Sequence, residues 1–385
     1  MHFGADAVYT GSTYSLRSLT DIDDLYKAEQ IIDYCHKKNV RVYITVNTFL
    51  FEREIQGYIS HIRKAAELKP DAFIIADPGA VYIMREISPK IPIHLSTQAN
   101  TLNSMAVKFW AENGIKRVNL GRELTLQDIS EIRHKIQDTE LEVFIHGALC
   151  LSISGKCLLS DFLTGNSANR GKCKHPCRWN YKIIEENRGR AVFYMENSKD
   201  FVSFFSPYDL MSLEFLPEIV ELKINSLKIE GRMKGPFYTG MTVHAYRKNI
   251  DRIFDGKGID PSDIDRLLFV TRRGYGQGFY KKDEERDLSI TQFESIPGSE
   301  HCFLGVVSDI IFFRDCRYVL IMLKNNLELN TRCEIISPEG ENIFLVEEML
   351  DKDYSALNMA KPNSQVYIKI DNPSISINDI IYRLK

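Results

Sequence analysis

Four of the chain's eight cysteines lie close together in the sequence, at Cys150, Cys157, Cys173 and Cys177. Four thiolates can fill a tetrahedral zinc site or hold a cubane iron–sulfur cluster. Structural zinc sites usually draw paired ligands from two tight knuckles, and only Cys173 and Cys177 have that spacing. The wider gap between Cys150 and Cys157 therefore favours an iron–sulfur cluster, with zinc or free thiols as the alternatives.

A cysteine nucleophile is another interpretation of this stretch, with Cys150 or Cys157 activated by His146. It explains one cysteine and leaves three unexplained. The chain has no HExxH, P-loop or GxGxxG motif that would indicate a different chemistry. Basic residues form a cationic rim at the far end of the stretch, at Arg170, Lys172, Lys174, His175 and Arg178. The net charge of −3 neither requires nor excludes nucleic acid, so this local excess matters more.

Short apolar runs alternate with amphipathic stretches from residue 5 to about residue 235, the pattern of βα units around a parallel sheet. Strands are predicted at residues 7–11, 41–47, 72–77, 93–98, 116–122, 141–146 and 226–230. Helices are predicted at residues 21–38, 52–68, 78–87, 104–113, 125–136 and 236–254, and another ends at 219–223.

Closed βα barrels have eight strands, and the alternation supplies seven. Because the chain begins almost inside a βα unit, we expect a TIM-like (β/α) barrel that lacks its first strand. A second, paralogous subunit is a candidate source of that strand. An open doubly wound sheet is the competing fold.

Six of the predicted strands end in a hydrogen-bonding or ionisable residue: Asn47, Asp77, Gln98, Arg122, His146 and Glu230. Barrel enzymes place their chemistry at the carboxyl ends of the strands, so these residues predict a polar funnel there. For a single residue the plainer explanation is that loops are polar, and Asp77-Pro-Gly has the composition of a turn.

The domain boundaries follow from the change of pattern. We expect a barrel over residues 1–255 with a cysteine-rich region at 141–180, a linker over 256–300, and a C-terminal β-barrel domain over 301–385. The last part contains six short β-rich runs and Ser337-Pro-Glu-Gly340, the composition of a hairpin turn. The other four cysteines adjoin apolar runs and are expected to pack in the cores: Cys35, Cys302, Cys316 and Cys333.

Long stretches of the chain resemble the collagenase-like peptidase family U32. FIHGALCLSISGKCLLS, RGKCKHPCRW and SLKIEGRMKGPFY carry this resemblance, and GADAVYTG, IHLSTQAN and GRELTLQDI are similar to the family's RNA-hydroxylating branch. The resemblance implies a barrel and a 4Fe–4S cluster on Cys150, Cys157, Cys173 and Cys177. It also implies an oxygen-independent, prephenate-dependent hydroxylation of the wobble uridine of tRNA at C5. The family carries a protease name as well.

Two features depart from the family pattern. The usual first strand, similar to ELLSPAG, is absent. Residues 179–208 form a shorter segment than in the longer tRNA enzymes, and SPYDL replaces SKDL there. Ribosomal RNA is therefore an alternative substrate to tRNA.

The polar strand ends and the basic rim suggest roles for further residues in such an RNA-modifying enzyme. His146, Glu230 and Arg232 would line the substrate pocket, Glu230 as an acid or base and Arg232 as a partner of the prephenate carboxylate. An ion pair between Glu230 and Arg232 that closes the barrel is the structural alternative. RNA phosphates would contact Arg170, Lys172, Lys174 and Arg178. The implied partners are tRNA or another RNA and the iron–sulfur assembly machinery.

Two other functions remain open, a peptidase and a zinc-containing RNA-binding scaffold. The sequence supplies no convincing catalytic set for a peptidase. No apolar run reaches the ~18 residues of a membrane helix, and the N-terminus has no basic region followed by an apolar core. We therefore expect a cytoplasmic protein without a membrane partner.

Overall fold

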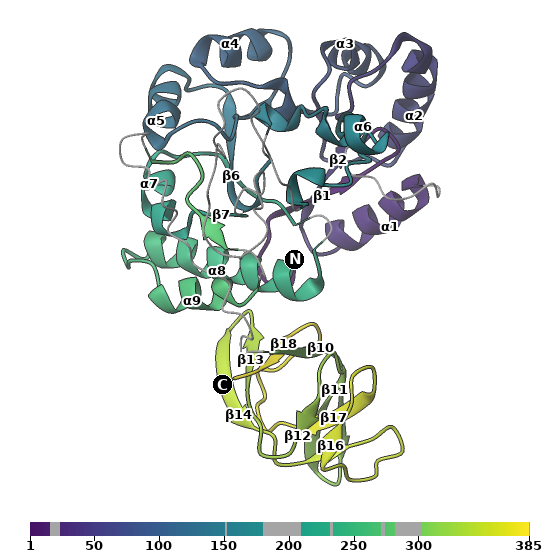
Figure 1. Cartoon of the computed structure of the whole chain (residues 1–385), viewed down its shortest axis with the longest axis vertical. Helices are drawn as coiled ribbons and strands as arrows, with labels where there is room; N and C mark the ends of the chain where they lie inside the picture. Colours follow the sequence, from purple (N-terminus) through teal and green to yellow (C-terminus); the bar gives the residue numbers. More distant parts are fainter. Residues whose placement is uncertain are drawn as a thin grey trace, which may run out of the picture.

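The computed structural model of the chain describes residues 1–15, 24–150, 152–179, 209–231, 234–270, 274–281 and 302–384. Figure 1 shows an α/β part, in which helices surround strands, above a C-terminal part built from strands. Both parts were predicted from the change of pattern along the sequence. No helix in the described ranges is long and apolar enough to cross a membrane.

The α/β part is organised around a parallel sheet. Its parallel strands are β1 (Ala7–Gly11), β2 (Arg41–Thr45), β3 (Ala72–Ile75), β4 (Ile93–Leu95), β5 (Arg117–Asn119), β6 (Glu140–Ala148) and β8 (Ser226–Ile229). Strands β1 to β6 pair in chain order, and β8 pairs with β6. All seven predicted strands are confirmed, although most end earlier than predicted because the polar residues after them turn into loops.

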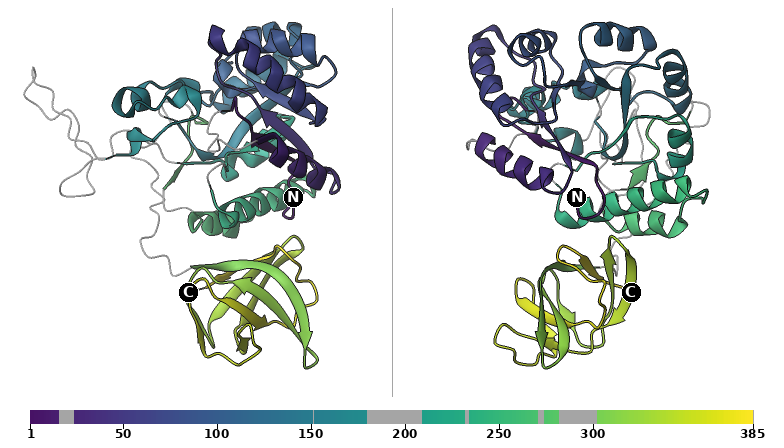
Figure 2. Two further views of the ribbon diagram at one scale, coloured as in Figure 1. Left: turned by 90° about the vertical axis from the view of Figure 1, so that its right-hand side faces the viewer. Right: turned by 180° about the vertical axis from the view of Figure 1, so that it is seen from behind.

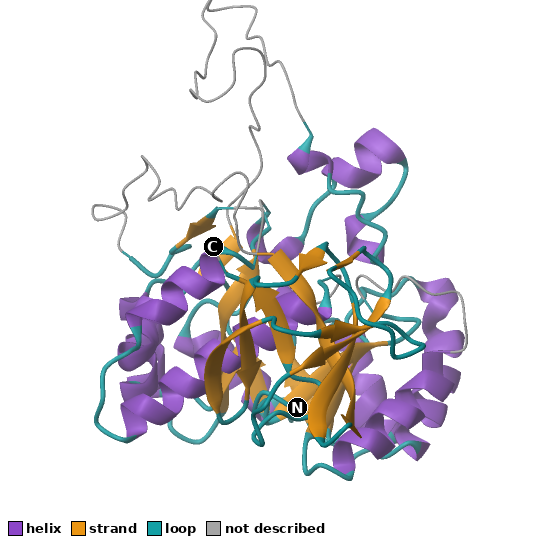
Figure 3. Ribbon diagram, turned by 90° about the horizontal axis from the view of Figure 1, so that it is seen from below, coloured by secondary structure: helices purple, strands orange, loops and turns teal. Residues whose placement is uncertain are grey.

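Helices cover the outside of this sheet in every view (Figures 1, 2 and 3). They are α1 (Asp24–His36), α2 (Ile55–Glu67), α3 (Pro78–Ile87), α4 (Ser104–Glu112), α5 (Leu126–Lys135), α7 (Leu216–Glu221), α8 (Pro236–Phe254) and α9 (Pro261–Leu268). The predicted cap of α5 is confirmed, because Thr125 and Asp128 form a reciprocal capping box. The apolar faces of these helices pack on the sheet in one continuous core.

The two outer strands β1 and β8 meet through side chains. Among the described residues no backbone ladder joins them. Instead, the hydroxyl of Tyr9 donates to the carbonyl of Ile229 at 3.5 Å, and the Lys228 ammonium lies 4.6 Å from the centre of the Tyr9 ring. The sheet is thus open at this seam, and a closed barrel stays a prediction.

Strand β6 changes partner along its length. Its residues 142–146 pair in parallel with β8, with a register shift between Phe144 and His146, and its residues 146–148 pair antiparallel with β7 (Asp209–Met211). A short strand β9 (Tyr275–Gly276) continues the sheet beyond β7. Neither β7 nor β9 was predicted, because each is only two or three residues long.

The C-terminal part is antiparallel. Its strands are β10 (Cys302–Phe313), β11 (Cys316–Met322), β12 (Leu327–Glu328), β13 (Arg332–Ser337), β14 (Gly340–Leu345), β15 (Met349–Leu350), β16 (Met359–Ala360), β17 (Gln365–Lys369) and β18 (Ile380–Arg383). The predicted hairpin turn joins β13 to β14. Two of the cysteines expected to pack, Cys35 and Cys333, are buried, whereas Cys302 and Cys316 are partly exposed.

The two parts contact each other beneath α8, as Figure 2 also shows. Met241 of α8 packs against Ile380 and Tyr382 of β18 in a small apolar cluster. Charged side chains surround this cluster: Lys248 lies 2.7 Å from Glu341, and Arg266 lies 3.1 Å from Glu334. The C-terminal part is therefore fixed to the α/β part by both apolar and ionic contacts.

Candidate active site

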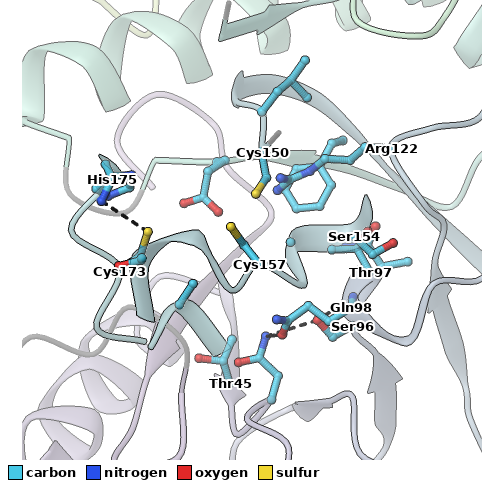
Figure 4. A pocket seen from close by; sticks show the side chains of 18 of the residues that line it. Thr45, Ser96, Thr97, Gln98, Arg122, Cys150, Ser154, Cys157, Cys173 and His175 are labelled. Atoms are coloured by element: carbon cyan, nitrogen blue, oxygen red, sulfur yellow. Dashed lines mark hydrogen bonds between the residues drawn. The ribbon is translucent and has the colours of Figure 1, made fainter. Parts of the chain in front are cut away.

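All four clustered cysteines line one cavity at the carboxyl ends of the parallel strands. The cavity is also lined by strand and strand-end residues: Tyr9, Thr45, Asn47, Ser96, Gln98, Asn119, Arg122, Phe144, Lys228 and Glu230. Figure 4 shows the thiols of Cys150, Cys157 and Cys173 beside these polar side chains. The structure thus brings together the cysteine cluster and most of the predicted polar funnel.

The loop between Cys150 and Cys157 is fixed to two neighbouring strand ends. Ser154, in a short 3-10 turn (Ile153–Gly155), has a left-handed backbone with φ of 49°. Its hydroxyl donates to Asn100 Oδ1 at 2.7 Å, and its backbone N–H donates to Glu123 Oε1 at 2.7 Å. Residues that follow β4 and β5 therefore anchor the cysteine loop.

The second pair of cysteines follows helix α6 (Leu159–Thr164), which was not predicted. Ser160 at its start is completely buried, donates to the carbonyl of Asn166, and accepts the backbone N–H of Lys174. These bonds hold the chain around Cys173 against α6. Backbone N–H groups also point at the sulfurs: Leu159 donates to Cys157 at 3.4 Å, and His175 donates to Cys173 at 3.3 Å.

The predicted metal centre requires ligands of a suitable chemistry and spacing, which the four cysteine sulfurs would have to supply. Soft thiolates are the usual ligands of iron–sulfur clusters and zinc, and hydrogen bonds to the sulfurs are a common feature of such cluster sites. One zinc ion would draw its sulfurs to within roughly 3.8 Å of each other, given a Zn–S bond near 2.3 Å. The described residues contain no group of three His, Cys, Asp or Glu side chains gathered to hold one metal ion.

The basic residues predicted to contact RNA have different surroundings. Arg170 forms an ion pair with Glu54, donates to the carbonyl of Phe49 at 2.6 Å, and lies over the ring of Phe51. These contacts fasten the cysteine segment to the loop after β2. Lys172 and Lys174 are exposed. The side chain of Arg178 lies outside the described part of the structure.

His146 is placed in the core, and it is not among the residues that line the cavity. It is 1% exposed, and its ring lies 3.1 Å from the Tyr275 hydroxyl and 3.4 Å from the Tyr246 hydroxyl. Burial lowers the pKa of His146 to about 3, so the ring is neutral at physiological pH. Strand β6 turns this side chain inward, and the expected place in the pocket lining is wrong.

Glu230 lies in the wall of the cavity. It is 4% exposed, and its backbone N–H donates to the carbonyl of His146 at 2.9 Å. The neighbouring strand approaches so closely that only glycine fits at position 147, where φ is +109°. Its predicted partner Arg232 falls outside the described residues.

Two predicted funnel residues have structural roles. Asp77 caps α3 by accepting the backbone N–H of Ala80 at 3.0 Å, and it also accepts the N–H of Leu50. Asp77 is therefore a helix N-cap, and Pro78 and Gly79 begin α3 instead of forming a turn. Asn47 donates to Gln98 Oε1 at 3.0 Å and to Ser96 Oγ at 3.2 Å, which joins the ends of β2 and β4 across the cavity.

A buried ion-pair network beneath the cavity was missed. Arg117 lies 2.6 Å from Glu140 and 3.8 Å from Glu142, and Glu142 lies 2.8 Å from Lys228. His94 adjoins this network, and burial lowers its pKa to about 3. The sequence does contain a signal for this network. Polar residues alternate with apolar ones inside the strands, as in Arg117-Val-Asn119, and the polar residues of such a strand share one face.

Comparisons with known proteins extend over nearly the whole chain. The family model described as "Peptidase family U32" matches residues 1–289. The model described as "Peptidase family U32 C-terminal domain" matches residues 299–381. The boundary between the two matches agrees with the change from α/β to β structure.

Three curated relatives carry three different names. The chain is 32% identical to tRNA hydroxylation protein P of Haemophilus influenzae, with 93% of this chain and 87% of the relative covered. It is 33% identical to a collagenase of Porphyromonas gingivalis, over 72% of this chain and 69% of the relative. It is 32% identical to the 23S rRNA 5-hydroxycytidine C2501 synthase of Escherichia coli, over 66% of this chain and 37% of the relative.

Proposed function

Since this chain belongs to peptidase family U32, we propose that it is an RNA-modifying enzyme that hydroxylates the wobble uridine of tRNA at C5. The relative matched over most of both chains is named for tRNA hydroxylation, which supports RNA hydroxylation as the reaction class. The observation that carries the proposal is the position of the four cysteines, which line the same cavity as the buried strand-end residues.

In this proposal Cys150, Cys157, Cys173 and Cys177 hold a 4Fe–4S cluster. The four thiols share one cavity, yet no three metal-binding side chains among the described residues are gathered around a single point. A cluster with four iron corners suits such spread ligands better than one zinc ion does. When bound, the cluster would supply redox or Lewis-acid chemistry beside the substrate, and the iron–sulfur assembly machinery would load it.

The remaining residues bind and orient the substrates. The Glu230 carboxylate lies in the cavity wall, where it can act as an acid or base beside a bound substrate. The Arg122 guanidinium, 3.9 Å from the centre of the Phe144 ring, is a cation of the described lining suited to the carboxylates of prephenate. Lys172 and Lys174, with Arg178, would contact RNA phosphates.

Anaerobic purification tests the proposal. The protein is analysed for iron and sulfide, and then incubated with unmodified tRNA and prephenate before nucleoside mass spectrometry. We expect iron, sulfide and 5-hydroxyuridine, all lost in Cys157→Ala and retained in Cys316→Ala, whose thiol lies in the C-terminal part. A protein without iron and sulfide whose Cys157→Ala variant still hydroxylates RNA would overturn the cluster assignment.

Hydrolysis of protein substrates is the second candidate, because one relative is named a collagenase. A cysteine peptidase would need a base beside Cys150, but the His146 ring is hydrogen bonded to two tyrosine hydroxyls in the core. Hydroxylation of ribosomal RNA is the third, supported by the relative named for 23S rRNA. Cleavage of a collagen peptide, abolished by Cys150→Ala, would favour the peptidase, and 5-hydroxycytidine in ribosomal RNA would favour the third candidate.

A further inference from the structure

Asn119 has an unsatisfied polar atom in the described wall of the cavity. It is the last residue of β5, and it lies two residues after Arg117 on the same face of the strand. The Arg117 side chain is held by Glu140 and Glu142 below the cavity, whereas Asn119 reaches the lining itself. Asn119 is 2% exposed, and its Oδ1 atom has no hydrogen-bond partner among the described residues.

A buried carbonyl oxygen without a donor is costly, at about 1–3 kcal/mol. The other amides at the same mouth are already engaged, because Asn47 donates to the Gln98 carbonyl and to Ser96. The acceptor of Asn119 is therefore placed for a group that enters the cavity. That group must carry a hydrogen-bond donor and must be small enough to lie between strand ends.

A complementary donor lies beside this acceptor. The register of β4 with β5 pairs His94 with Arg117 and Leu95 with Val118, so the next residues in line are Ser96 and Asn119. Neighbouring strands are about 4.8 Å apart, and both side chains line the cavity. The Ser96 hydroxyl accepts from Asn47 and from the N–H of Gln98, and its own proton has no acceptor among the described residues.

An acceptor next to a donor matches the edge of a pyrimidine base. In uracil the N3–H donor lies directly beside a carbonyl oxygen, and bases held in single-stranded form are read on this edge. On the premise of the proposed function, we propose that Asn119 accepts the N3–H of the target uracil while Ser96 donates to the adjacent carbonyl. Asn119 is then the residue that selects the base. The C5–C6 edge faces away from β5, into the cavity that the four cysteines line.

A methyl group in place of the N3 hydrogen of the target uridine tests this assignment without any change in the protein. Binding is measured anaerobically for RNA stem-loops that carry uridine or 3-methyluridine at the target position. A lost buried hydrogen bond of about 1.4 kcal/mol is a tenfold change in affinity, so we expect wild-type protein to prefer uridine by about tenfold. Equal binding of the two RNAs would overturn the proposal.

Substitutions test whether Asn119 is responsible for the preference for uridine over 3-methyluridine. Asn119→Leu should bind uridine more weakly and lose its preference over 3-methyluridine, whereas Asn119→Asp keeps an acceptor and should keep the preference. Asn342→Leu, on an exposed strand of the C-terminal part, is the matched control. A preference that persists in Asn119→Leu would overturn the role of Asn119 while hydroxylation by wild-type protein still stands. Absence of both RNA binding and hydroxylation in wild type would instead reject the proposed function.

Discussion

Gly147 of β6 lies directly against Glu230 at the end of β8. A Cβ atom at position 147 would overlap the carbonyl oxygen of Glu230 and lie 2.9 Å from its Cβ atom. The backbone of Gly147 also has φ of +109°, which residues with a side chain rarely adopt. The position of the Glu230 carboxylate in the cavity therefore depends on a glycine in the neighbouring strand.

Gly147→Ala is expected to destabilise the chain and displace Glu230. The clash and the backbone strain together should lower the free energy of unfolding by about 2–4 kcal/mol, measured by denaturant titration. Gly256→Ala is the matched control, because Gly256 also has positive φ but no atom within 4 Å of an added Cβ. The control should lose about 1 kcal/mol. Equal losses in the two variants would show that the contact with Glu230 is unimportant.

Ser154→Ala should loosen the loop that carries Cys150 and Cys157. The substitution removes the hydrogen bond to Asn100, which contributes about 1 kcal/mol. We expect faster loss of iron from the anaerobically purified protein in the presence of a chelator. Ser152→Ala, in the same loop but without a capping hydrogen bond from its side chain, should release iron at the wild-type rate. Identical rates for both variants would contradict the anchoring role.

Substitutions in the Arg170–Glu54 ion pair should affect iron retention, whereas substitution of an exposed lysine should affect tRNA binding. Arg170→Gln and Glu54→Gln are both expected to lower iron retention, because either breaks the tie between the cysteine segment and the loop after β2. Lys172→Gln should leave iron content unchanged, weaken tRNA binding, and reduce the slope of log affinity against log salt by about one. The prediction fails if Lys172→Gln leaves the salt slope unchanged.

Acid should weaken the contact between the two parts of the chain. A hydrogen bond from His244, together with contacts to Lys248 and Arg266, lowers the pKa of Glu341 to about 2 from the ordinary 4.5. Because the folded pKa is the lower one, this stabilisation is fully present above pH 4.5 and is lost as the pH falls toward 2.

Glu341→Gln should accordingly be less stable than wild type at pH 6, and the difference should shrink as the pH falls below 4.5. Thermal melting from pH 6 to pH 3 measures it. Glu347→Gln, at an exposed position shortly after β14, should follow the wild-type curve. A constant difference between Glu341→Gln and wild type across this range would contradict the assignment.

The fold was predictable where the pattern is strongly periodic. Runs such as residues 41–47 and 72–77 each gave a confirmed strand, and the cap at Thr125 gave a confirmed helix start. Strand β7 was missed because three residues carry no periodicity, and it forms only because the end of β6 extends beyond β8. The contacts between β1 and β8 were not predicted, because they are made by single side chains and no sequence pattern expresses them.

The site was predictable in its residues more than in their roles. The four cysteines and Glu230 share a cavity as expected. The core position of His146 and the ion pair of Arg170 were not predicted, because their partners, Tyr275 and Glu54, are more than a hundred residues away in the sequence. The role proposed for Asn119 was not predicted, because the sequence pattern extends the strand to Arg122, three residues beyond its actual end.

Nucleoside mass spectrometry of RNA from cells that lack this gene tests the central claim most directly. The wobble uridines of tRNA should lose 5-hydroxyuridine and the nucleosides derived from it. Wild-type protein should restore them, whereas Cys157→Ser should not. Unchanged levels of these nucleosides in cells without the gene, with no redundant enzyme present, would contradict tRNA hydroxylation by this protein.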